Sequence, residues 1–78
     1  MKESYSNPAY DSFGITPDNS TVVEFKALYV GGAGDVTIVT AAGNTALFEA
    51  VPAGTILPAQ GTKVKSTGTT ATKITGMR

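Results

Sequence analysis

Hydrophobic and polar residues alternate in short runs from Thr21 to the C-terminus, with the two-residue period that is typical of β-strands. In the first run, TVVEFKALYV (21–30), the odd-numbered residues from Val23 to Tyr29 are expected to face a core. Leu28 and Val30 share the opposite side with the charged residues, so we expect the far end of that side to be covered as well. The pattern predicts a strand over 21–30.

Four further runs predict strands at 36–40, 45–51, 62–66 and 68–77. VTIVT (36–40) is β-branched at every position, which is a strong strand signal. The segment 52–58 is bracketed by prolines, which cannot donate to a central ladder, and it is predicted to be a connection or edge segment carrying Ile56 and Leu57. No run has the period of a helix.

These elements predict an all-β fold, a small antiparallel β-sandwich or barrel of five to six short strands over residues 21–78. Residues 1–20 are polar, show no strand or helix period, and carry three aromatic residues, Tyr5, Tyr10 and Phe13. A purely solvated tail has few aromatics, so an extended N-terminal arm that docks its rings on a neighbour explains them better than a free tail.

A glycine-rich stretch, Gly31-Gly32-Ala33-Gly34-Asp35, raises the question of a phosphate-binding loop. Such a loop needs a helix after its glycines, because the phosphate binds at the helix N-terminus. Here VTIVT follows, so the stretch is predicted to be a hairpin turn in which glycines supply positive φ angles. A second turn is predicted at Gly43-Asn44.

Composition limits the chemistry. The 78 residues include no Cys and no His, which removes disulfides, thiolate and imidazole metal ligands, and the usual neutral-pH general base. A chain this short buries only about 60% of its unfolded surface, so association with other copies is the expected support. The formal net charge of zero and the absence of a long apolar run argue against nucleic-acid and membrane partners, and no cofactor is expected.

Catalytic groups are scarce as well. Glu24, Asp35 and Glu49 are the carboxylates in or beside the strands, and a small sheet has little room for a cleft that would desolvate a pair of them. Lys63, Lys65 and Lys73 are interpreted as solvated, since the strand aromatics are expected to face the core. The sequence therefore predicts a protein that is not an enzyme.

The run ALYVGGAGDVTIVTAAGNTALFEAVPAGTILP and the later STGTTATKITGM resemble small virion proteins of tailed bacteriophages and phage-like gene transfer agents. The resemblance covers residues 27–77 and identifies the head-spike base or capsid vertex (decoration) proteins as the family. Two positions depart from the family pattern: Ala59-Gln60-Gly61 stand where a basic residue is common, and the chain ends in Gly76-Met77-Arg78 instead of apolar or aromatic residues.

The resemblance implies a structural protein on the capsid exterior of a virion, made in the host cytoplasm. It implies a homo-oligomeric ring, a pentamer at the five-fold vertex, that contacts the major capsid protein and anchors a spike or fibre protein. Leu28, Val30, Ile56 and Leu57 would then seal against adjacent subunits. The alternatives are a trimeric decoration or minor capsid protein and a small carbohydrate-binding adhesin that uses Tyr5, Tyr10 or Tyr29.

Overall fold

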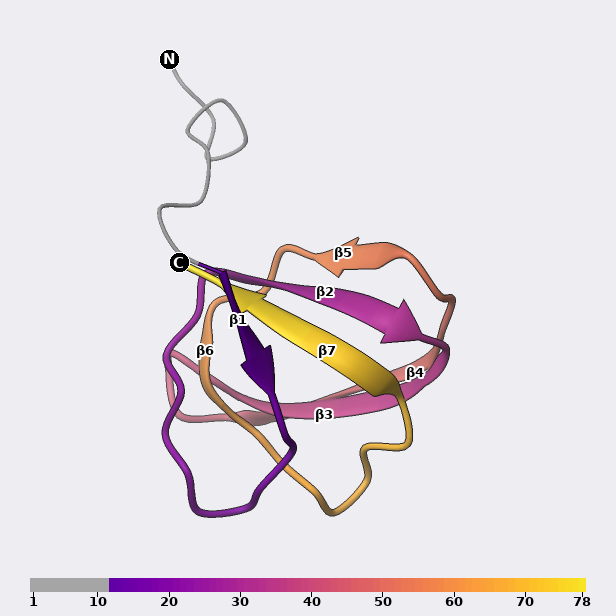
Figure 1. Cartoon of the computed structure of the whole chain (residues 1–78). Helices are drawn as coiled ribbons and strands as arrows, with labels where there is room; N and C mark the ends of the chain where they lie inside the picture. The colour runs from indigo at the N-terminus through magenta and orange to yellow at the C-terminus, as the bar shows by residue number, and fades with distance from the viewer. Residues whose placement is uncertain (1–11) are drawn as a thin grey trace.

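The computed structural model describes residues 12–78, which form seven β-strands and, over this range, no helix (Figure 1). The strands are β1 (Ser12–Ile15), β2 (Ala27–Gly32), β3 (Gly34–Thr40), β4 (Thr45–Val51), β5 (Thr55–Leu57), β6 (Gly61–Val64) and β7 (Thr72–Met77). The predicted all-β fold is confirmed, with seven strands instead of five to six.

The strands form two antiparallel sheets. Sheet A has four strands in the order β1-β7-β2-β5, and sheet B has three in the order β4-β3-β6. Between the sheets lies one hydrophobic core. Its buried members are Ile15, Phe25, Leu28, Val30, Val36, Ile38, Val51, Val64, Ala71 and Ile74.

A continuous bent ladder joins the two sheets at one corner. Ahead of β2, Phe25 exchanges backbone hydrogen bonds with Gly61 at 2.9 and 3.0 Å, and Val23 N donates to Thr62 O at 2.7 Å. After a bend at Lys26, the same chain continues as β2 and pairs with β5. A Cβ on Gly61 would lie 2.7 Å from the carbonyl oxygen of Val39, so only glycine allows this approach.

The bend reverses which side chains face inward. Phe25 is buried as expected, but the next buried residues are Leu28 and Val30, each with no exposed surface. Tyr29, expected in the core, is 41% exposed. Leu28 and Val30 are covered as expected, by the core of their own chain, whereas the expectation that Tyr29 faces the core is wrong. One extra residue at the corner shifts the two-residue period, as a β-bulge does.

The glycine-rich stretch is a second corner. Gly31 and Gly32 end β2 and Gly34 begins β3, yet β2 pairs with β5 and β7 while β3 pairs with β4 and β6. The predicted hairpin is therefore wrong, because the chain passes here from sheet A to sheet B. At Gly34 φ is 155°, and an added Cβ would lie 2.6 Å from the backbone nitrogen of Ala71.

Part of the predicted arm belongs to the domain. Ser12–Ile15 form β1, which pairs with β7, and Phe13 packs against the core of its own chain with the guanidinium carbon of Arg78 4.2 Å from its ring centroid. Phe13 is thus not available as an arm anchor. Tyr5 and Tyr10 lie outside the described residues, so an arm over residues 1–11 stays a prediction.

The segment 18–25 covers the outer edge of β6. Asp18 N donates to Val64 O at 2.8 Å, and Asp18 Oδ1 accepts the backbone N–H of Ser20 at 2.8 Å. The Ser20 hydrogen bond is the main cause that lowers the pKa of the Asp18 carboxyl below its ordinary value. This Asx turn directs the chain along β6.

We expect Gly34→Ala to destabilise the protein by at least about 1 kcal/mol, because alanine is strained at positive φ and its methyl group would meet backbone atoms of the neighbouring loop. Urea denaturation measures the change. Gly14→Ala is the matched control, since a Cβ at Gly14 has no neighbour within 4 Å. Equal midpoints for the two variants would contradict the close approach at Gly34.

Candidate assembly surface

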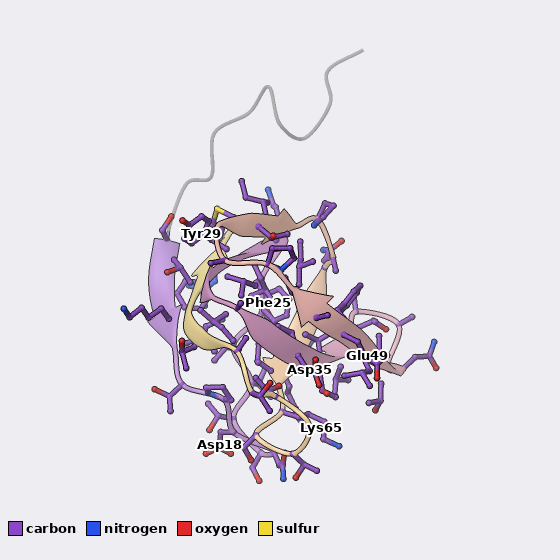
Figure 2. The ribbon with its side chains drawn as sticks, turned by 90° about the vertical axis from the view of Figure 1, so that its right-hand side faces the viewer. Asp18, Phe25, Tyr29, Asp35, Glu49 and Lys65 are labelled. Atoms are coloured by element: carbon purple, nitrogen blue, oxygen red, sulfur yellow. The ribbon has the colours of Figure 1, made fainter. Side chains whose placement is uncertain are left out.

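The outer face of sheet A carries an exposed apolar pair. Tyr29 on β2 and Ile56 on β5 are direct cross-strand partners, 41% and 48% exposed. Figure 2 shows Tyr29 at the surface, whereas Phe25 lies in the interior. Leu57, the next residue, is half-buried and packs against the core. Of the four residues predicted to contact a neighbour, Ile56 therefore remains exposed, while Leu28 and Val30 lie in the core.

A strained residue adjoins this pair. Lys73 on β7 is exposed and has φ of 54°, which is unusual for a residue with a side chain. A Cβ on Gly31 would lie 3.0 Å from Lys73 Cβ and 3.7 Å from Cε2 of the Tyr29 ring, so the three residues are neighbours. We call the group formed by Tyr29, Ile56, Gly31 and Lys73 the Tyr29–Ile56 patch. It combines an aromatic, an aliphatic and a cationic side chain on one face.

Asp35 organises the corner beside Gly34. Its Oδ1 accepts the backbone N–H of Ala50 at 2.9 Å, and Ala50 has φ of 54° within β4. The pairing of β3 with β4 shifts register at this point, which marks a β-bulge. Asp35 also accepts the backbone N–H groups of Thr70 at 2.9 Å and Ala71 at 3.1 Å through its carbonyl oxygen. Figure 2 shows Asp35 and Glu49, which precedes Ala50, in the same region. The role of Asp35 in this geometry is structural.

Beside part of β3, threonine hydroxyls accept the backbone N–H groups that a neighbouring strand would otherwise pair with. Thr70 Oγ1 accepts the N–H of Asp35 and Thr69 Oγ1 accepts the N–H of Thr37, both at 2.9 Å. Thr37 is the buried polar residue of the described range, and its hydroxyl donates to Gly68 O at 3.0 Å. Residues 66–71 thus form a loop held by side-chain hydroxyls, and β7 begins at Thr72 instead of at residue 68. The threonine-rich composition of this segment was the available signal for the loop.

The hairpin between β3 and β4 contains the Gly43-Asn44 pair. Gly43 has φ of 91° and donates to Thr40 O at 2.8 Å, while Thr40 N donates to Asn44 O at 2.7 Å. This loop lies at the end of sheet B. Among the described residues, none of its hydrogen bonds involves a residue of the Tyr29–Ile56 patch. The pair serves as a turn.

The charged residues of the described part of the chain do not gather into a metal-ligating group. Over residues 12–78, no group of three or more His, Cys, Asp or Glu side chains could hold a metal ion. A hollow at the corner near Phe25 is lined by Glu24, Lys26 and Arg78 among others, and Arg78 Nε donates to the carbonyl oxygen of Glu24 at 3.1 Å. Its lining includes a single acidic side chain, Glu24, so it does not offer a carboxylate pair. In the same described range, no helix is long and apolar enough to cross a membrane.

Comparison with known proteins gives one informative result. A chain of a solved structure described as "Capsid of native GTA particle computed with C5 symmetry" shares 33% sequence identity with this chain, at a TM-score of 0.82. The match covers 99% of this chain and 92% of that chain. Neither the models of known protein families nor the curated proteins give a match.

We expect Asp35→Ala to lower stability by about 1–3 kcal/mol, because the N–H of Ala50 loses a charged acceptor while its strained backbone remains. Thermal or urea denaturation measures the loss. As a control, Glu49→Ala removes an exposed carboxylate on β4, next to Ala50. This variant is expected to change the free energy of unfolding by less than about 0.5 kcal/mol. A loss with Glu49→Ala as large as that with Asp35→Ala would show that Asp35 does not anchor the bulge.

Proposed function

The chain belongs to the family of the gene transfer agent capsid component described above, and from that premise we propose that it is a structural protein on the exterior of a phage-like capsid. The relation to that component extends over nearly the whole of both chains, so it does not rest on one short motif. Among the described residues, the exposed apolar pair Tyr29 and Ile56 is the kind of surface that binds another protein. In this proposal the protein acts by binding, with no reaction catalysed.

We further propose that the protein forms a small ring, a pentamer at a five-fold vertex, which contacts the major capsid protein and serves as the base of a spike or fibre. In a particle of C5 symmetry, any chain that lies off the axis occurs in multiples of five, which is compatible with such a ring. A domain of this size is supported by burying surface against neighbours.

The Tyr29–Ile56 patch is the surface that we assign to attachment. Large side chains that are half exposed next to one another on a sheet gain free energy when a partner covers them. Lys73 adds a cation at the rim of this patch, as is common for polar groups around an apolar contact. The observation that carries the attachment proposal is the exposed cross-strand pair itself.

We expect native mass spectrometry of the full chain over a range of concentrations to show a discrete pentamer that dissociates on dilution. Its formation depends on concentration because the subunits are held by non-covalent burial of surface. A discrete trimer would favour a decoration protein at a three-fold site instead. A monomer at every concentration would contradict the ring.

We expect incorporation of the double variant Tyr29→Ser/Ile56→Ser into particles to fall at least roughly tenfold. Covering the two half-exposed side chains contributes about 1–3 kcal/mol to the free energy of attachment. The measurement is the number of copies per purified particle by quantitative mass spectrometry. Val22→Ser is the control, because Val22 is 58% exposed but lies outside the patch. Unchanged incorporation of the double variant would assign attachment to another surface.

A further inference from the structure

Each sheet of the described domain has two edges, and two of these four edges are covered or flanked by prolines. The outer edge of β6 is paired with the segment 18–25 through the hydrogen bonds of Asp18, Val23 and Phe25. β5 has only three residues and lies between Pro52 and Pro58, which interrupt any extended pairing. These are the usual means by which proteins prevent edge-to-edge association.

The edge of β4 lacks such a device over Thr45–Phe48, because its charged residue, Glu49, and the β-bulge come after these positions. β4 spans seven residues, pairs with β3 on one side, and has no pairing partner on the other side among residues 12–78. Its sequence, TALFEAV, contains neither Lys nor Pro, and Leu47 is 52% exposed. The backbone N–H and C=O groups along this outer edge are therefore available for pairing with another strand.

The β-bulge sets the length of this available edge. Four consecutive pairs with β3, from Thr45 to Phe48, are in regular register, and the bulge at Asp35 and Ala50 interrupts the strand after them. β1, from Ser12 to Ile15, also has four residues, and its outer side has no partner among the described residues. The two free edges thus match in length.

The geometry points to an interface in which the edge of β4 in one copy pairs with the edge of β1 in the next copy of this chain. The inference rests on the proposed ring, because a ring of odd order needs a contact between two different surfaces of the protein. β5 is excluded as the partner by the prolines at 52 and 58 that flank it, and β6 by its covered edge. The pairing joins sheet B of one copy to sheet A of its neighbour and leaves the Tyr29–Ile56 patch, on a face and not an edge, open for a different partner.

Hydrogen–deuterium exchange of the wild-type chain tests this pairing directly. In the assembled protein, the amides of Thr45–Phe48 and of Ser12–Ile15 are expected to exchange at least roughly tenfold more slowly than in the dilute protein. The exchange rates of the β5 amides are expected to change little. Assembly with unchanged exchange in β4 would overturn the inference and leave the ring intact. Protection of β4 without β1 would also overturn it, and would indicate a β4–β4 contact in a dimer instead.

A pair of matched variants tests whether the edge of β4 takes part in assembly. Leu47→Lys is expected to raise the concentration needed for assembly by roughly tenfold or more, because an ammonium group at the edge is desolvated by the neighbouring strand. Val22→Lys makes the same change at a residue of similar exposure that lies outside β1, β4 and the Tyr29–Ile56 patch, and it is expected to leave assembly in solution unchanged. If Leu47→Lys assembles at the same concentration as Val22→Lys, the inference is wrong. A wild-type protein that stays monomeric at every concentration would contradict both the ring and the interface.

Discussion

The close contact of backbone with backbone at two corners is the constraint on which the rest of the fold depends. At Gly61 the chain meets the carbonyl oxygen of Val39 and the ring of Phe25, and at Gly34 it meets the backbone of Thr70 and Ala71. A methyl group at either position would occupy space that backbone atoms or an aromatic ring already fill. Because these approaches are possible, two small sheets close over one core with short connections.

The central strand of sheet B shows how such a small domain satisfies its polar groups. β3 pairs with β4 on one side, and on the other it pairs first with β6 and then with a loop in which Thr69 and Thr70 supply hydroxyl acceptors. No buried side-chain nitrogen or oxygen of the described residues lacks a hydrogen-bond partner. Asp35 extends the same principle to the bulge in β4, where a carboxylate stabilises a backbone conformation that alanine adopts at a cost.

With the inner faces and the polar groups satisfied within the domain, two kinds of surface remain for assembly. The inner faces of both sheets are used by the core, so the outer face of sheet A, with Tyr29 and Ile56, is available for a partner. The edge of β4 offers backbone groups instead of side chains, and such groups recognise any strand of compatible length. A face and an edge can be used at the same time. This separation is consistent with a protein that contacts its own copies and a capsid together, as the proposed function requires.

The sequence by itself determined the strand content and several of the turns. Alternation and β-branched runs place β3 and β4 close to their observed positions, because the two-residue period of a strand is a local property. The same reasoning was wrong about Tyr29, which is exposed, and about the hairpin predicted at the glycines of 31–34. In both cases the decisive event is a corner, where one extra residue reverses the period or the chain changes sheets.

Only the tertiary structure decided which strand each strand meets, and therefore which side chains are exposed. Tyr29 is a surface residue because the chain bends at Lys26 between the two sheets, and no local pattern encodes that bend. The threonines at 69 and 70 resemble strand residues in sequence, yet they form a loop because their hydroxyls reach a strand more than thirty residues away. Local periodicity specifies elements, whereas contacts between distant segments specify the surface through which this protein binds.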